Sequence, residues 1–246
     1  MSAAPPRDWI APEWPAPPGV RALVTTRAGG SSRGAFASLN LGTRVGDDPS
    51  AVERNRERLR SLLPGDPVWL QQVHGADAID AAAAGHLPRA DAAVARTRHA
   101  VCAVLTADCL PVLLADRGGR GVGIAHAGWR GMVAGVVQAA VTRMGTPPGE
   151  IVAWLGPAIG PGSYEVGREV YDAFIAQDAG AAAAFVPRGE GKFLADLYAL
   201  ARRALTASGV TSVHGGGYCT LTDRDRFFSY RREKSTGRMA SLVWMD

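Results

Sequence analysis

Three residues of types that bind metal ions stand where apolar segments end: His74, Cys109 and His126. Strand ends are where active sites of α/β proteins are assembled. Two imidazoles and one thiolate would hold a tetrahedral zinc ion with one open position, which is the catalytic rather than the structural arrangement. The separations of 35 and 17 residues match no compact zinc finger. A buried core thiol with surface or hydrogen-bonded histidines is therefore the alternative interpretation.

Candidate anion-binding residues lie in three other segments. The segment 127–131 follows His126 with two glycines and Arg130, and leads into a predicted helix whose start would attract an anion; close strand-to-helix packing is the alternative. Arg27 precedes a glycine-rich loop and has Asn40 as a possible partner, although it could also be a solvated arginine. The stretch 227–238, with Ser229 and Arg232, mixes aromatic and cationic residues. It would hold a base and a phosphate, or form a hairpin with a charged edge.

The other histidines and cysteines have a plainer interpretation. His86, His99 and His214 lie in polar or glycine-rich contexts, so we expect them in loops. Cys102 belongs to an apolar segment and is expected in the core, and for Cys219 we favour packing over a role in the site.

Composition excludes several classes of protein. With 47% hydrophobic and 20% charged residues the chain is typical of globular proteins rather than disordered or fibrous ones. A net charge of +4 does not indicate a nucleic-acid partner. Three cysteines cannot build a disulfide framework, and the beginning of the chain has no secretory signal, so a cytoplasmic location is expected. No apolar segment is long enough to span a membrane, and the sequence fixes no oligomeric state.

The periodicity of apolar residues predicts the elements that position these side chains. Continuous apolar runs, typical of buried sheet, alternate with segments in which apolar residues recur at three and four. Strands are expected at 21–26, 68–73, 100–107, 110–115, 121–125, 151–155 and 241–245, and helices at 50–63, 132–144, 168–177 and 194–207. This pattern predicts an α/β or α+β fold. Without internal repeats or a linker, we expect a single domain over 21–246, preceded by an extended arm over 1–20.

A series of short motifs spread along the chain resembles the laccase-domain family, also called multicopper polyphenol oxidases. Its bacterial members include purine nucleoside phosphorylases and the peptidoglycan editing factor. The matching segments are TTR (25–27), SLNLG (38–42), VGDDP (45–49), QVHG (72–75), TADCLP (106–111), HAGWRG (126–131), GPAIGP (156–161), FSYRR (228–232) and TGRMA (236–240). Many members have a cysteine after the GPAIGP segment, whereas this chain has Gly162 and Ser163.

The resemblance implies a fold, a metal and an activity. The fold would be one layered catalytic laccase-like domain with mixed β-sheets sandwiched by helices, related to toxin domains that hydrolyse amides with a cysteine and a histidine. Zinc would bind at His74, Cys109 and His126. Family members are described as phosphorolysing adenosine, inosine and S-methyl-5′-thioadenosine, and as deaminating adenosine.

The leading hypothesis is therefore a zinc-dependent purine nucleoside enzyme with a nucleoside and phosphate as its small-molecule partners. Arg27 and the helix start after Arg130 would bind phosphate, because phosphorolysis needs a held anion. Asn40 and Asp108 would orient the sugar or base. Deamination would use the open metal position, with Asp108 as proton shuttle.

Three alternatives remain. A copper-dependent phenol oxidase would use the same ligands, but five histidines cannot supply several copper sites. An amide hydrolase in peptidoglycan precursor editing would use Cys109 as nucleophile with His126 or His74 as base. A non-enzymatic binding protein would not need three metal ligands converging from strand ends.

Overall fold

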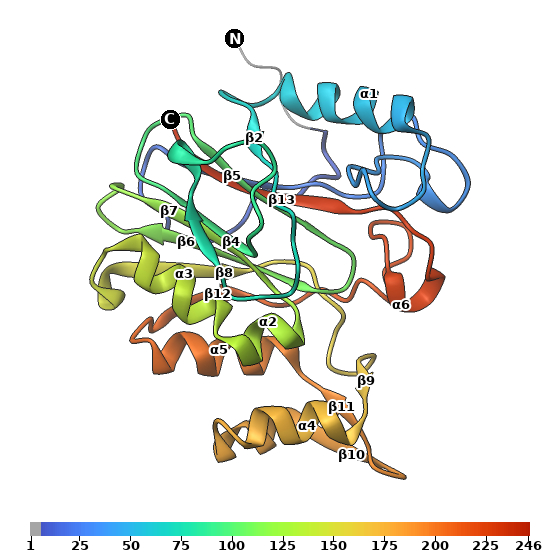
Figure 1. Cartoon of the computed structure of the whole chain (residues 1–246), viewed down its shortest axis with the longest axis vertical. Coiled ribbons are helices and arrows are strands. Elements are labelled where there is room, and N and C mark those ends of the chain that lie inside the picture. The colour runs from blue at the N-terminus through green and yellow to red at the C-terminus, as the bar shows by residue number, and fades with distance from the viewer. Residues whose placement is uncertain (1–5) are drawn as a thin grey trace.

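The computed structural model describes residues 6–246, which build layers of helices and sheets (Figure 1). The strands are β1 (Val20–Val24), β2 (Pro67–Val68), β3 (Ala78–Asp80), β4 (Ala92–Ala95), β5 (Val101–Thr106), β6 (Leu110–Asp116), β7 (Val122–Ala127), β8 (Ile151–Leu155), β9 (Glu165–Val166), β10 (Phe185–Gly189), β11 (Lys192–Ala195), β12 (Ser212–Gly215) and β13 (Met239–Met245). The helices are α1 (Pro49–Arg60), α2 (Trp129–Ala134), α3 (Val136–Met144), α4 (Arg168–Ile175), α5 (Leu197–Ala207) and α6 (Tyr230–Glu233).

Two mixed sheets pack face to face in the centre. One has the strand order β1-β13-β5-β2 and the other β12-β8-β6-β7-β4-β3. Strand β6 is apolar from Leu110 to Ala115, since Leu113 faces the core between the sheets while Val112 and Leu114 face the core under the helices. Alternate side chains of a strand point to opposite faces, so a strand buried on both faces has few polar positions.

Helices cover the outer faces of both sheets. Figure 1 shows α1 on one side of the molecule and α2, α3 and α5 on the other. Leu59 of α1 packs with Val101 and Leu242 on the outer face of the first sheet. A small sheet, β10-β11-β9, lies beside α4 at the end remote from α1. This confirms the expected α/β fold with mixed sheets between helices.

Most predicted elements are confirmed, with ends that shift by a few residues. The predicted strands at 100–107, 110–115, 121–125, 151–155 and 241–245 are β5, β6, β7, β8 and β13. The predicted helices at 50–63, 168–177 and 194–207 are α1, α4 and α5, and residues 192–195 ahead of α5 form β11 instead. Among residues 6–246, no helix has the length and apolar character needed to cross a bilayer.

Two predicted elements are interrupted. The single helix expected over 132–144 is divided because Gly135 adopts a left-handed conformation, with φ of 92°, between α2 and α3. The strand expected over 68–73 ends as β2 at Val68. Beyond it, the Gln72 carboxamide takes over the pairing with β5, since it donates to the Leu105 carbonyl at 2.8 Å and accepts from the Leu105 N–H at 2.8 Å.

Two further expectations need correction. His214 lies in β12, not in a loop, and the stretch 227–238 contains α6 rather than a hairpin. In the described part of the arm expected over 1–20, Trp9 and Ile10 are buried and Ile10 forms a bridge with Val24. Residues 1–5 of that arm lie outside the described part.

Candidate active site

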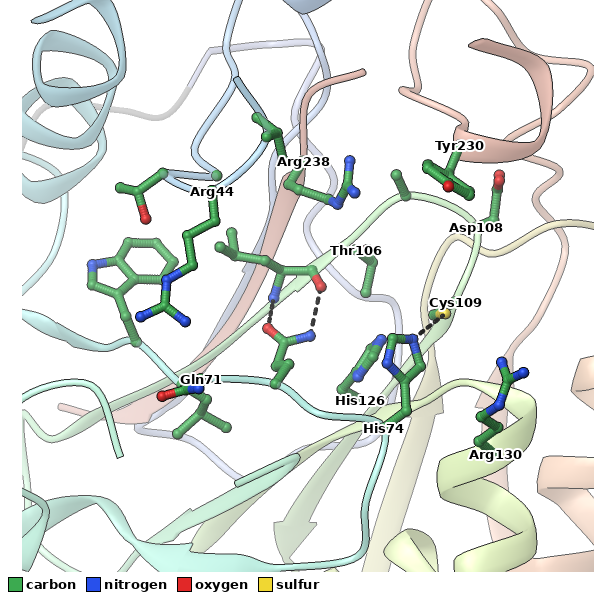
Figure 2. A pocket seen from close by; sticks show the side chains of 18 of the residues that line it. Arg44, Gln71, His74, Thr106, Asp108, Cys109, His126, Arg130, Tyr230 and Arg238 are labelled. Atoms are coloured by element: carbon green, nitrogen blue, oxygen red, sulfur yellow. Dashed lines mark hydrogen bonds between the residues drawn. The ribbon is translucent and has the colours of Figure 1, made fainter. Parts of the chain in front are cut away.

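The three predicted metal ligands meet at one place (Figure 2). Their ligand atoms all lie within 4.8 Å of one another, and Nε2 of His74 is 3.9 Å from Sγ of Cys109. Strand pairing explains part of this, since Leu110 of β6 pairs with Ala127 of β7 and so brings Cys109 close to His126. Bonds of about 2.0–2.3 Å in a tetrahedral zinc site separate ligand atoms by roughly 3.3–3.8 Å. The group is therefore able to bind a metal ion after small movements.

A buried carboxylate that the sequence analysis missed holds two of these ligands. Asp91 is fully buried and accepts hydrogen bonds from the backbone N–H groups of Val73, His74 and Gly75 at 3.0, 3.0 and 2.7 Å. Its Oδ1 also lies 2.8 Å from Nδ1 of His126. A carboxylate on the second nitrogen is the usual support of a metal-binding histidine, so this contact fits a metal ion at Nε2.

The sequence did contain a signal for Asp91. It is a single acidic residue within the apolar segment 90–95, all of which is buried. Aspartate is almost never fully buried without a partner, so an acidic residue inside an apolar segment indicates a paired or ligand-supporting group.

Gly128 provides the space that the ligands need. A Cβ atom at this position would lie 2.9 Å from Sγ of Cys109 and 3.1 Å from Cδ2 of His74. The backbone angles of Gly128, φ −68° and ψ 162°, are ones that any residue adopts. The requirement for glycine here is therefore steric and comes from the ligands.

The charges of the group favour a thiolate. Burial alone would raise the pKa of Cys109, but the charges and hydrogen bonds of His126 and His74 outweigh it and lower this pKa to about 6. Burial likewise works against a charged His126, whereas Cys109 and Asp91 raise the pKa of His126 to about 9. A thiolate is the form of cysteine that binds metals and attacks carbonyl groups.

The ligand group lies on the wall of a cavity of about 730 Å³. The cavity is rich in cations and aromatic rings. Its cationic residues are Arg44, Arg56, Arg130, Arg231, Lys234 and Arg238, and its aromatic residues are Trp69, Trp129, Tyr164 and Tyr230. Asp108 is the one carboxylate among the described lining residues, so the cavity attracts anionic ligands.

Asp108 lines this cavity beside Cys109, as the sequence analysis expected of a site residue. Its carboxylate is held by the Thr220 hydroxyl and by the Arg231 backbone N–H, each at 2.6 Å. Asp108 also has a positive φ of 88°, a strained conformation for a residue other than glycine. These contacts fix the chain just before Cys109.

Arg130, predicted to bind substrate, also lines the cavity. The other predicted phosphate-binding feature is the start of the helix that follows Arg130. The Arg130 guanidinium stacks over the Trp129 ring at 4.4 Å and has no hydrogen bond or ion pair within residues 6–246. Helix α2 has only six residues, so the side chain of Arg130 rather than the helix start is the strong anion-binding feature.

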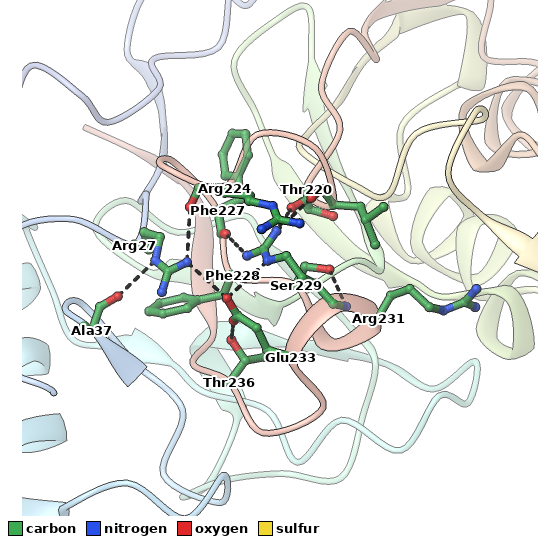
Figure 3. A network of polar contacts seen from close by, with 12 residues as sticks. Arg27, Ala37, Thr220, Arg224, Phe227, Phe228, Ser229, Arg231, Glu233 and Thr236 are labelled. Carbon is green, nitrogen blue, oxygen red and sulfur yellow. Dashed lines mark hydrogen bonds and ion pairs between the residues drawn. The ribbon is translucent and has the colours of Figure 1, made fainter. Parts of the chain in front are cut away.

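Arg27 does not line the cavity, contrary to the expectation that it binds phosphate. Figure 3 shows its guanidinium within a network of polar contacts. Its Nε donates to the Ala37 carbonyl at 3.0 Å, and Nη1 donates to the Arg224 carbonyl at 3.1 Å and pairs with Glu233 at 3.4 Å. The guanidinium also covers the Phe228 ring at 4.7 Å. The planar fork of arginine suits such carbonyl clamps, so Arg27 joins two loops.

Arg232 and Ser229 are likewise absent from the cavity lining. Arg232 donates to the carbonyl groups of Thr220, Leu221 and Phe227 at 2.8 to 2.9 Å. Ser229 caps α6 by accepting from the Arg232 N–H at 3.3 Å. Both shape the 220–233 segment behind the cavity wall, and the expectation that they contact substrate is corrected.

Asn40 is buried and acts on the cavity only through a neighbour. Its Oδ1 accepts from the backbone N–H groups of Gly42 and Arg238, each at 2.9 Å, and its Nδ2 donates to Asp47 at 2.9 Å. Because these contacts occupy its amide, Asn40 positions Arg238 instead of orienting a sugar.

The remaining cysteines behave as the sequence predicted. Cys102 is fully buried in the core between the sheets. Cys219 accepts from the Gly160 N–H at 3.3 Å and lies 3.4 Å from the Ser163 hydroxyl, and it is not one of the residues that line the cavity.

The chain is similar to proteins that carry the name purine nucleoside phosphorylase. It is 56% identical to purine nucleoside phosphorylase PA4543 of Pseudomonas aeruginosa over 239 residues, covering 97% of this chain and 98% of that protein. Purine nucleoside phosphorylase YfiH of Escherichia coli is 52% identical, with 96% of this chain and 98% of that protein covered.

Solved structures agree with the fold and the family. The crystal structure of Neisseria meningitidis NMB0706 matches with a TM-score of 0.95 and 53% identity, covering 98% of this chain and all of that one. YlmD from Geobacillus stearothermophilus matches with a TM-score of 0.87 and 32% identity, covering 93% of this chain and 92% of that one. The family model described as multi-copper polyphenol oxidoreductase laccase matches residues 21–246, and the chain belongs to this family.

Proposed function

We propose that the protein is a zinc-dependent purine nucleoside phosphorylase acting on adenosine, inosine and S-methyl-5′-thioadenosine. The products would be the free base and ribose 1-phosphate or its methylthio derivative. The observation that carries the proposal is the His74, Cys109 and His126 group on the wall of a strongly cationic cavity. The names of the relatives support the same activity.

Zinc suits the donor set because it accepts thiolate and imidazole together. When bound, it would supply a fixed positive charge and Lewis acidity to a substrate heteroatom in the cavity. Asp91 keeps His126 in the orientation that presents Nε2, and Gly128 leaves the ligands room to approach one another. Three free cysteines are compatible with a reducing compartment, so we also propose a cytoplasmic location.

The chain's own cations would hold the phosphate. In phosphorolysis the bond between the anomeric carbon and the base nitrogen breaks, and a phosphate oxygen forms the new bond to that carbon. Arg130 is free to bind the attacking anion, and Arg238 adds positive charge from the opposite wall (Figure 2). The base leaves with the bonding electron pair and takes up a proton.

Product analysis with and without phosphate tests the proposal. Adenosine should yield adenine and ribose 1-phosphate only when phosphate is present, and the purified protein should carry about one zinc per chain. Free ribose formed at an unchanged rate without phosphate would refute phosphorolysis. Bound copper, with phenol oxidation faster than adenosine cleavage, would favour the oxidase instead.

Adenosine deamination is proposed as a second activity of the same metal site. It would convert adenosine to inosine and ammonia without any need for phosphate. Chelation of the metal should abolish it, and failure to form inosine in phosphate-free buffer would remove this activity from the proposal.

A cysteine amide hydrolase is the second candidate function, favoured by one specific arrangement. Asp91 contacts His126 at 2.8 Å, and His126 stabilises the Cys109 thiolate, which resembles a cysteine, histidine and aspartate triad. Such an enzyme would form an acyl adduct on Cys109 during turnover. Detection of that adduct by intact-mass measurement would favour the hydrolase, for example one acting on a peptidoglycan precursor, over the phosphorylase.

A further inference from the structure

We infer that Arg44, Gln71 and Trp69 form a subsite that binds the purine base by the edge that carries N7 and the substituent at carbon 6, at the end of the cavity remote from Arg130. The inference rests on the proposed phosphorylase activity and assigns residues that set its choice of base.

The positions of the labelled residues give the order along the cavity. Figure 2 shows Arg44 and Gln71 on one side of His74 and Cys109, and Arg130 on the other. Gln71 and His74 are three residues apart, so their Cα atoms are separated by at most about 10 Å. A nucleoside with its base at Gln71 would then place its sugar near His74 and its reacting carbon toward the phosphate at Arg130.

Arg44 and Gln71 have polar groups with no partner in the protein. Within residues 6–246, neither the Arg44 guanidinium nor the Gln71 carboxamide takes part in a hydrogen bond or an ion pair, although both residues line the cavity. Their neighbours differ in this respect. The carboxamide of Gln72 is used by Leu105, and Arg56 donates to the Leu41 carbonyl at 3.0 Å. Free donors and acceptors on a cavity wall are available to a ligand.

Trp69 adds a flat surface at the same end. Its indole ring is partly buried and lines the cavity, and the Arg56 guanidinium stacks on it at 4.4 Å. This packing limits the movement of the ring. An aromatic ring held in place in a cavity is a stacking platform that accepts any base.

The two free groups match two kinds of purine edge. A 6-oxopurine presents O6 and N7, both acceptors, and a guanidinium donates to both of them. An adenine presents N7 as an acceptor and the 6-amino group as a donor, and a carboxamide satisfies both. Arg44 would thus favour inosine and Gln71 adenosine, which explains how one cavity would accept both nucleosides.

The orientation also separates the two proposed activities. Deamination at the metal would need carbon 6 of the base close to His74 and Cys109, which is the reverse of the orientation described here. Loss of Arg44 or Gln71 should therefore impair phosphorolysis and leave deamination of adenosine nearly unchanged.

Near-isosteric variants test the subsite through the separate effects on KM and kcat. Arg44→Met should raise KM for inosine at least tenfold and KM for adenosine less than threefold, while Gln71→Leu should do the reverse, with kcat nearly unchanged in both. Trp69→Leu should raise both KM values. Arg58→Met, an exposed arginine of α1 that does not line the cavity, is the matched control and should change neither.

Calorimetric binding of hypoxanthine and adenine distinguishes failure of the subsite from failure of the enzyme proposal. The protein could show no phosphorolysis while Arg44→Met selectively loses binding of hypoxanthine and Gln71→Leu selectively loses binding of adenine. In that case the subsite is supported and the proposed activity is refuted. If phosphorolysis occurs and the variants match the control, the subsite is overturned. If the wild-type protein binds neither base, the subsite is overturned as well. Thermal melting of each variant shows that the fold is kept.

Discussion

Replacing Gly128 with alanine should weaken metal binding while leaving the fold intact. The new methyl group would lie 2.9 Å from Sγ of Cys109 and 3.1 Å from Cδ2 of His74. Carbon atoms pack at about 3.5–4.0 Å, and the larger sulfur atom comes no closer. The thiolate must therefore move by roughly 0.6 Å, while metal sites tolerate distance errors of about 0.2 Å.

The size of the effect follows from this displacement. We expect the affinity for zinc to fall by about 10–100-fold, comparable to the loss of a supporting partner of a metal ligand. That change corresponds to roughly 1.4–2.8 kcal/mol of binding free energy. The backbone contributes little, because Gly128 already has angles that alanine adopts.

Gly167→Ala is the matched control. Gly167 caps α4 as Gly128 caps α2, with φ −84° and ψ 176°. The three atoms nearest to a Cβ there all belong to the side chain of the exposed Glu169, which is free to move. Both substitutions carry the same helix-capping penalty of about 0.5–1 kcal/mol. A difference in zinc affinity between the two variants is therefore caused by the contact of the new methyl group with the metal ligands.

Competition with a chromophoric chelator measures the zinc affinity, and melting with and without zinc measures its coupling to stability. If Gly128→Ala folds, binds zinc within twofold of the wild-type affinity and keeps full activity, the proposed arrangement of the ligands is wrong.

Four further outcomes are expected. Alanine at His74, Cys109 or His126 should each abolish zinc binding, and retention of stoichiometric zinc by all three variants would rule out the site. Asp91→Asn should lower zinc affinity about 10–100-fold. The control Asp116→Asn alters a carboxylate that is equally buried and hydrogen-bonded but lies outside the cavity, and it should lower only the melting temperature. Equal zinc affinities of the two variants would contradict the role of Asp91. Arg27→Ala should lower the melting temperature without raising KM for phosphate, because the Arg27 guanidinium joins loops outside the cavity. A selective rise in the KM for phosphate would show that Arg27 binds phosphate after all. In metal-free protein, the rate at which iodoacetamide labels Cys109 should rise as the pH passes the pKa of about 6, because the thiolate is the reactive form. Labelling that begins only near pH 8–9 would contradict the lowered pKa.

Much of the fold could be predicted from local pattern. The central strands β5, β6 and β7 are buried on both faces, so nearly every position is apolar and the strands stand out in the sequence. The metal ligands could be proposed for a related reason, because a histidine or cysteine directly after such a strand lies at the sheet edge where active sites are assembled. The resemblance to a known family then strengthened His74, Cys109 and His126 over the alternative of a buried core thiol.

The roles of the arginines and of Asp91 were decided by tertiary structure. Arg27 and Arg44 are both arginines beside glycine-containing loops, yet one guanidinium is occupied by carbonyl groups of residues 37 and 224 and the other faces the cavity without a partner among residues 6–246. Asp91 acquires its role only because the segment 73–75 and strand β7 both pack against its carboxylate. Apolar burial leaves a periodic record along the chain, whereas the use of a polar group depends on which distant donors and acceptors the packing of the sheets brings within hydrogen-bonding distance.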